Sequence, residues 1–117
     1  MSKRGKRKPE TATPKVQSNV VRTAERLANA PLSAFGVEEL RFAIGQRMRL
    51  DDLMDLAVPE LERDPFVAGS FYRGDLLVSV LRTDVAFWKK NHHHVERVEK
   101  IVKTVRKHLD EHPSVQR

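Results

Sequence analysis

The five histidines are the side chains in this sequence best suited to hold a metal ion, because neutral imidazole is a common metal ligand. Three of them, His92, His93 and His94, are consecutive. Consecutive side chains on a helix point about 100° apart, so these three are not expected to converge on one ion. His108 and His112 are spaced to share one helix face, but no third ligand accompanies them. The sequence therefore predicts no metal site and no cofactor.

The residue types that carry most enzymatic chemistry are missing or scattered. The chain has no cysteine, no glycine-rich phosphate loop and no nucleophile motif of the hydrolase type. Carboxylates gather on only one predicted helix, where a solvated acidic face is the ordinary interpretation and a general acid and base pair the rarer one. We therefore expect a protein that is not an enzyme, and we name no catalytic residue.

Acidic side chains are grouped in the stretch "RLDDLMDLAVPELERD", residues 49–64. At helical spacing its leucines face inward, while Asp51, Asp55 and Glu62 share the opposite face. This helix and the one before it, joined through Gly45, have the order of a helix-turn-helix, but an acidic face would repel DNA phosphates. Asp51, Asp55 and Glu62 are instead candidates to bind a cationic partner protein. An acidic surface without a partner is the alternative interpretation.

The stretch "GSFYRGDLL", residues 69–77, places the only tyrosine of the chain in a connection between two helices. Gly69 and Gly74 can adopt backbone angles closed to other residues, so the connection can fold back and pack Phe71 and Tyr72 against the helices. Asp75 would cap the next helix. In the alternative interpretation the loop faces a partner with two side chains of the types enriched in interface hot spots, Tyr72 and Arg73.

Apolar residues recur every three or four positions along almost the whole chain, which is typical of helices. The pattern predicts five of them, and the first begins near Ser18; they lie within residues 18–31, 35–46, 49–64, 74–88 and 92–112. Gly45 is expected to supply a left-handed residue at the end of the second helix. Pro59 should kink or restart the third near Val58, because proline removes a backbone hydrogen bond. We expect an all-α, single-domain bundle of about five helices over residues 18–112, followed by a C-terminal tail at 113–117.

Phe87 and Trp88 end the bulkiest apolar stripe of the sequence, which lies in the fourth predicted helix. The indole of Trp88 is the largest side chain in that stripe. We therefore expect Trp88 to be buried in the core.

The net charge of +6 is concentrated at the N-terminus. The stretch "MSKRGKRKPETATPK", residues 1–15, holds six basic residues and one acid, while the rest of the chain is nearly neutral. With almost no apolar residue, residues 1–17 are expected to form a disordered basic tail. Residues 1–15 could contact nucleic acid nonspecifically, so a small helical nucleic-acid-binding protein is the alternative function. No run approaches the roughly 20 apolar residues of a membrane span, and we expect a cytoplasmic protein.

Four segments, "ELRFAIGQ", "LDDLMDLAVPELERDP", "GSFYRGDLLVSVL" and "FWKK", resemble, in their order and spacing, the bacterial immunity proteins of contact-dependent growth inhibition (CDI) systems. The similarity extends from about Leu32 to Lys90. The chain departs from the family pattern at Pro59, Ser70 and Arg73. The residues that match are Leu40, Arg41, Ile44, Gly45, Gln46, Gly69, Phe71, Tyr72, Gly74, Asp75, Leu76, Leu77, Phe87 and Trp88.

This resemblance implies a cytoplasmic protein that binds the C-terminal toxin domain delivered by a neighbouring cell. Such a protein blocks the toxin's active site or its access to substrate and is not itself an enzyme. For a basic nuclease toxin, the acidic face of residues 49–64 would be the complementary surface. The sequence leaves the oligomeric state open.

Overall fold

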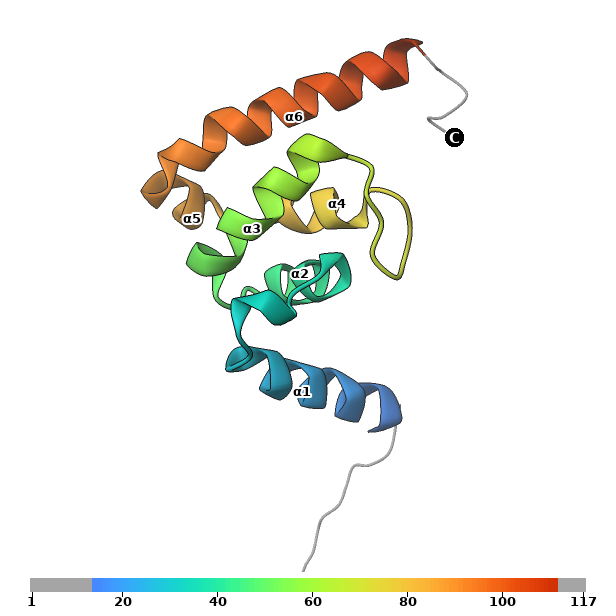
Figure 1. Ribbon diagram of the computed structural model, residues 1–117, viewed down its shortest axis with the longest axis vertical. Coiled ribbons are helices and arrows are strands. Elements are labelled where there is room, and N and C mark those ends of the chain that lie inside the picture. The colour runs from blue at the N-terminus through green and yellow to red at the C-terminus, as the bar shows by residue number, and fades with distance from the viewer. Residues whose placement is uncertain (1–13, 112–117) are drawn as a thin grey trace, which may run out of the picture. The chain divides into compact units, whose positions relative to one another are not determined.

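A computed structural model of the protein describes residues 14–111, and within them the fold is all-α, as predicted. No strand occurs in this part of the chain, apart from an isolated bridge between Ala68 and Arg73. No helix among residues 14–111 is long and apolar enough to span a membrane. Figure 1 shows the elements, which are α1 (Pro14–Ala28), a 3₁₀ turn η2 (Leu32–Ala34), α2 (Val37–Gly45), α3 (Leu50–Arg63), α4 (Asp75–Leu81), α5 (Val85–Lys90) and α6 (His92–Glu111).

The chain divides into two compact units between Ala30 and Pro31. The described part of the first unit is α1, which begins at Pro14, four residues before the expected start at Ser18. Proline suits the first turn of a helix, because its missing N–H would have no partner there. Residues 14–17 of the predicted tail thus belong to α1. Residues 1–13 lie outside the described part.

The second unit is built around α3. This helix packs against α2 and α4 on one side and against α6 on the other, and α5 packs on α6 (Figure 1). Apolar side chains at helical spacing on each of these helices point into the shared interior. The buried ones include Leu40, Ile44, Leu53, Met54, Ala57, Leu61, Leu76, Val80, Phe87, Val98 and Ile101.

The turn between α2 and α3 differs from the prediction. Gly45 is the last residue of α2, and the left-handed residues follow later, at Arg47 (φ 60°) and Arg49 (φ 48°). The predicted left-handed Gly45 is therefore wrong. Gly45 instead lies against α4, because a Cβ atom at this position would be 3.6 Å from Oγ of Ser79.

Pro59 lies inside α3, which runs without interruption from Leu50 to Arg63. The restart predicted near Val58 does not occur. A proline at this position removes only the hydrogen bond to the carbonyl of Asp55, a residue on the exposed side of the helix. On the buried side, Leu53, Ala57 and Leu61 are fully buried on both sides of the proline and hold the helix together.

The fourth predicted helix is two helices, α4 and α5, separated at residues 82–84. Thr83 is buried, and its Oγ1 donates to the carbonyl of Ser79 at 3.4 Å. Asp84 is extended and is the N-cap residue of α5. The indole Nε1 of Trp88 then donates to the carbonyl of Thr83 at 3.1 Å. Side-chain hydrogen bonds thus satisfy backbone carbonyls at the break between α4 and α5. The apolar spacing alone does not indicate this break.

Phe87, not Trp88, is the buried aromatic residue of α5. Its side chain is 8% exposed, whereas Trp88 is half-buried and meets Phe87 edge-on with ring centroids 5.1 Å apart. The expectation that Trp88 is a core residue is therefore only partly met. A tryptophan at the end of a short helix keeps one edge in solvent when its N–H must reach a nearby carbonyl.

We expect Phe87→Ala to lower the free energy of unfolding by about 3 to 5 kcal/mol, the usual cost of deleting a buried ring. Trp88→Ala should cost less, because part of the indole is already in water. Urea unfolding curves of the two variants test this order. A larger loss for Trp88→Ala would show that the indole is the main anchor of α5.

Candidate functional site

Asp75 organises the loop that precedes α4. Its carboxylate is 2% exposed, and Oδ1 accepts a hydrogen bond from the backbone N–H of Gly69 at 2.7 Å. Oδ2 accepts from the N–H groups of Phe71 at 3.0 Å and Tyr72 at 3.4 Å. The expected role of Asp75 as a helix cap is therefore wrong, because Gly74 occupies the cap position and Asp75 holds the loop instead.

Charge and hydrogen bonding keep Asp75 ionised despite its burial. Burial raises the pKa of this carboxyl, but the three loop N–H groups and the guanidinium of Arg41, 3.9 Å away, outweigh it. The net effect is a pKa below the usual range. The loop is thus fixed by charge-assisted hydrogen bonds, which are stronger than neutral ones.

Glu38 and Arg41 of α2 form a second anchor for the same loop. Arg41 donates to both carboxylate oxygens of Glu38, with Nε 2.8 Å from Oε1 and Nη2 2.6 Å from Oε2. Oε1 also accepts from the backbone N–H of Ser70 at 2.7 Å. The hydrogen bond from Arg41 is the main reason that the pKa of Glu38 falls to about 2. This pair joins α2 to the loop.

The two glycines of the loop have different roles. Gly74 has φ +90°, a left-handed conformation that favours glycine, as predicted. Gly69 is not in this region, so the prediction fails there. Its need for glycine comes from close approach, because a Cβ atom would lie 2.5 Å from Oε1 of Glu38 and 3.3 Å from its Cα.

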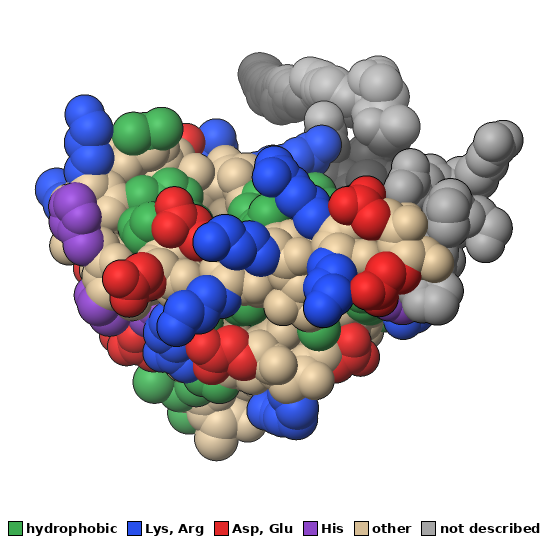
Figure 2. Space-filling model, turned by 90° about the horizontal axis from the view of Figure 1, so that it is seen from above, with side chains coloured by type: hydrophobic (Ala, Val, Ile, Leu, Met, Phe, Trp, Pro, Cys, Tyr) green, Lys and Arg blue, Asp and Glu red, His purple; other side chains and the backbone are tan. Residues whose placement is uncertain are grey.

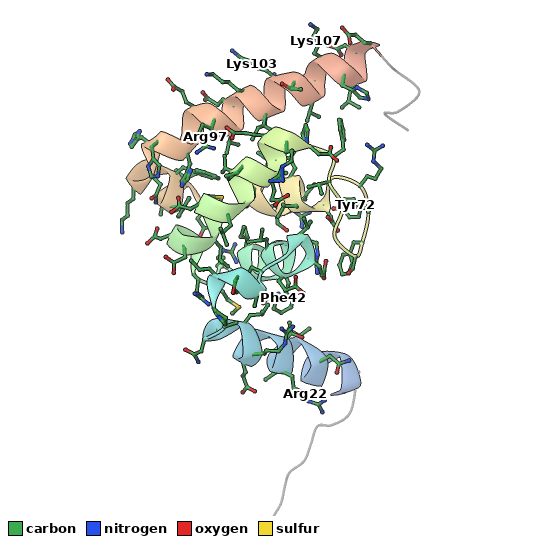
Figure 3. The ribbon with its side chains drawn as sticks, viewed as in Figure 1. Arg22, Phe42, Tyr72, Arg97, Lys103 and Lys107 are labelled. Atoms are coloured by element: carbon green, nitrogen blue, oxygen red, sulfur yellow. The ribbon has the colours of Figure 1, made fainter. Side chains whose placement is uncertain are left out.

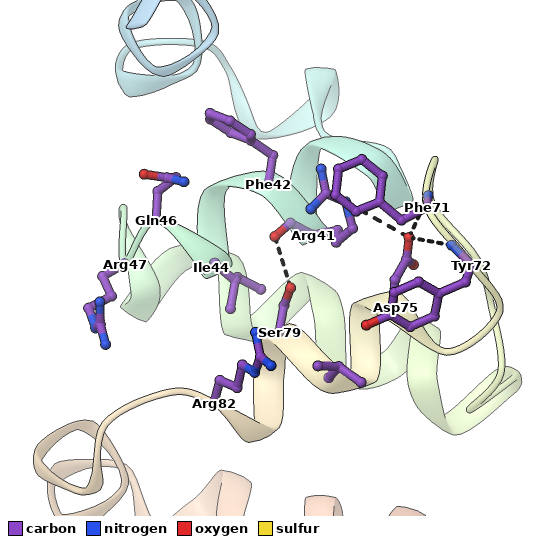
Figure 4. Close-up of a pocket in the computed structure, with 12 residues that line it drawn as sticks. Arg41, Phe42, Ile44, Gln46, Arg47, Phe71, Tyr72, Asp75, Ser79 and Arg82 are labelled. Atoms are coloured by element: carbon purple, nitrogen blue, oxygen red, sulfur yellow. Dashed lines mark hydrogen bonds and ion pairs between the residues drawn. The ribbon is translucent and has the colours of Figure 1, made fainter. Parts of the chain in front are cut away.

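The aromatic side chains of the loop point to solvent. Phe71 is 69% exposed and Tyr72 54% exposed, so the expectation that the loop packs them against the core is wrong. Their N–H groups are turned toward Asp75 (Figure 4), while most of each residue's surface is in contact with solvent. The guanidinium of Arg41 lies over the Phe71 ring, 4.1 Å from its centroid. Arg73 is also exposed, with its guanidinium 5.3 Å from the Phe66 ring.

Next to these aromatic residues is a groove of about 420 Å³ between α2 and α4. Its two helices are tied by a hydrogen bond from Ser79 Oγ to the carbonyl of Arg41 at 3.1 Å. Phe71 and Tyr72 line one end, and Arg47 and Arg82 line the other (Figure 4). We call the exposed loop residues and this groove the loop–groove surface; its members are Arg41, Phe42, Ile44, Gly45, Gln46, Arg47, Phe71, Tyr72, Arg73, Asp75, Val78, Ser79 and Arg82.

The acidic side chains predicted on α3 are exposed, but two of the three are paired with α6. Glu62 accepts from Nε and Nη2 of Arg97, at 2.7 and 2.6 Å, and these hydrogen bonds lower the pKa of Glu62. Asp55 Oδ1 lies 2.9 Å from Nε2 of His94. Asp51 makes no ion pair among residues 14–111. Two of the three predicted acids are thus offset within the chain.

The two candidate partner surfaces lie apart. Figure 3 places Tyr72 and Arg97 on opposite sides of the second unit, so the loop–groove surface and the acidic residues beside α6 do not form one site. Seen from the α6 side, acidic and basic side chains are interspersed and no large patch of one sign appears (Figure 2). Sequence reasoning located the loop, but it missed Arg47 and Arg82, which only the packing of α2 on α4 brings to the groove.

The histidine run also differs from its prediction. The ring centroids of His93 and His94 are 4.0 Å apart, and ligand atoms of both, with one of Asp55, lie within 4.8 Å of one another. His92 lies outside this group, so the three consecutive histidines do not converge, as predicted, but two of them meet beside α3 because their imidazoles reach far from the backbone. The His108 ring meets the Phe66 ring at a tilt of 56°, with centroids 5.1 Å apart, and His112 lies outside the described residues.

Comparison with known proteins gives one clear match. Residues 6–98 match the family of CDI immunity proteins, a range that contains every residue of the loop–groove surface. Neither the curated proteins nor the solved structures yield a match.

Proposed function

The chain belongs to the CDI immunity protein family, and from this premise we propose that it binds the cognate toxin domain and neutralises it by blocking its active site or the path of its substrate. The immunity protein contributes no chemistry to this inhibition. It acts by occupying a surface that the toxin needs. The family membership is the observation that carries this proposal.

The loop–groove surface is the proposed contact with the toxin. Exposed aromatic and arginine side chains are the types that dominate binding energy at interfaces, and here Phe71, Tyr72 and Arg73 are adjacent in one loop. The hydrogen bonds of Asp75 and Glu38 fix the backbone of this loop before any partner arrives. A preorganised loop loses little conformational entropy on binding, so more of the contact energy remains as affinity.

A nuclease is the proposed class of toxin. Nucleases bind phosphate through cationic surfaces. The residues that the sequence suggests as contacts for such a cationic surface are Asp51, Asp55 and Glu62. Of these, Asp51 keeps its charge unpaired among the described residues. These acids could speed the encounter with a cationic domain by electrostatic steering, while the loop–groove surface supplies the short-range contacts.

A binding titration of the purified toxin domain into the full chain tests this function. We expect a one-to-one complex with a dissociation constant of about a nanomolar or tighter. Added salt should slow association but leave a tight complex. Absence of binding to the toxin, together with affinity for nucleic acid that falls steeply with salt, would instead support the nucleic-acid-binding alternative through residues 1–15.

Neutralising the acidic face should have a small effect. The triple variant Asp51→Asn, Asp55→Asn, Glu62→Gln is expected to lose less than about fivefold in toxin affinity, because exposed charges are worth little and two of these are already paired. The loss should appear mainly in the association rate. Surface plasmon resonance at two salt concentrations measures it, after circular dichroism has confirmed the fold. A loss above about 100-fold would place the toxin on the acidic face.

A further inference from the structure

Three side chains with metal-binding groups meet where α6 begins beside α3. They are Asp55 of α3 and two residues from the first turn of α6, His93 and His94. Their ligand atoms all lie within 4.8 Å of one another, and Nε2 of His94 is 2.9 Å from Oδ1 of Asp55. This cluster is separate from the loop–groove surface.

Two imidazoles and one carboxylate form a ligand set typical of zinc sites that keep an open position. Bonds of about 2.0 to 2.2 Å in a tetrahedron hold the ligand atoms about 3.3 Å apart, so small side-chain rotations would suffice here. Asp55 and His93 are exposed, which gives an ion access from solvent. His94 is 2% exposed, so packing fixes the third ligand in place.

The ring of His94 presents Nε2 to the cluster, where it lies 2.9 Å from Oδ1 of Asp55. Its buried Nδ1 has no hydrogen-bond partner among the described residues, so when Nε2 binds an ion the ring proton on Nδ1 would have no acceptor among them. The guanidinium of Arg97, further along α6, donates to both carboxylate oxygens of Glu62.

We propose that Asp55, His93 and His94 form a binding site for one divalent transition-metal ion of the zinc type. In place of the direct contact between Asp55 and His94, both side chains would bind the ion as ligands. It would join the first turn of α6 to the middle of α3. Hard cations such as Mg²⁺ are not expected to bind, because they prefer an all-oxygen ligand set.

Calorimetric titration of Zn²⁺ into the full chain, prepared without an added histidine tag and freed of metal by a chelator, tests the proposal. We expect one ion per chain and a rise in melting temperature with Zn²⁺ but not with Mg²⁺. The variants His93→Ala and Asp55→Asn change exposed side chains and should still fold. Each should weaken Zn²⁺ binding at least about tenfold, the loss that even outer-shell partners of a metal cause.

His92→Ala is the matched control, because His92 is exposed, adjacent in sequence and outside the cluster. It should bind Zn²⁺ like the unmodified chain. If His92→Ala weakens binding as much as His93→Ala, the ion is held by the histidine run in general and the proposal is wrong. Equal binding by His93→Ala, Asp55→Asn and the unmodified chain, or no binding by the unmodified chain, would also overturn it.

Discussion

Replacing Phe71 and Tyr72 together with alanine is expected to weaken toxin binding by at least about 100-fold, which corresponds to about 2.7 kcal/mol and the range of a single interface hot spot. Both side chains project into solvent, so their removal leaves little of the core uncovered. Their backbone N–H groups, which bond to Asp75, are kept in the variant. Calorimetry with the cognate toxin domain measures the loss.

The control for this experiment is a second exposed apolar pair of the same unit. Leu81 and Val85 are 48% and 67% exposed and lie outside the loop–groove surface. The variant Leu81→Ala, Val85→Ala should bind the toxin like the unmodified chain. If this control loses as much affinity as the Phe71 and Tyr72 variant, the interface lies near α4 and α5 and not at the loop.

Replacing Asp75 with asparagine should be among the most destabilising changes in the second unit. We expect the free energy of unfolding to fall by about 3 to 5 kcal/mol, the usual cost of removing one partner from a buried charged network. The amide offers one oxygen where the carboxylate serves three N–H groups, and its NH₂ would face donors. Urea unfolding at pH 7 measures the loss. A change below about 1 kcal/mol would show that the loop holds its shape without Asp75.

Acid should weaken the same network. The pKa of Asp75 is lowered and that of Glu38 falls to about 2 in the folded protein, so both unfolded carboxyls, with pKa near 4, bind protons more readily. The stability that the ionised Asp75 and Glu38 contribute to the folded protein is therefore complete above about pH 5 and is lost as the pH falls toward about 2. The free energy of unfolding, measured by urea at each pH in this range, should fall steeply with pH for the unmodified chain and less steeply for Asp75→Asn. Parallel curves would contradict this assignment.

The sequence was a good guide to the longer helices. Apolar spacing alone located α2, α3 and α6, because each has a continuous stripe that faces the same interior. It failed at residues 82–84, where the break between α4 and α5 depends on hydrogen bonds of Thr83 and Trp88 that no periodicity records. It also failed at Gly45, because the turn that follows α2 uses arginines in the left-handed conformation that glycine usually supplies.

The site was only half visible in the sequence for a similar reason. The loop could be recognised from its glycines, Asp75 and the neighbouring aromatic residues. Aromatic residues usually pack inward, so the sequence predicted that these two would pack against the helices. In the structure both residues donate their backbone N–H groups to Asp75 and leave their side chains exposed. The pairs that offset the acidic face, Glu62 with Arg97 and Asp55 with His94, join residues 35 and 39 positions apart. Only the packing of α3 on α6 brings them together.

Hydrogen exchange of the free chain and of its complex with the toxin domain tests the central claim most directly, because it maps the contact without altering the protein. We predict that binding slows exchange in residues 69–74 and in residues 41–47, which are the second half of α2 and the turn after it, and leaves the exposed side of α6 unchanged. Protection confined to α3 and α6, with residues 69–74 exchanging as in the free chain, would contradict the assignment of the loop–groove surface as the toxin-binding site.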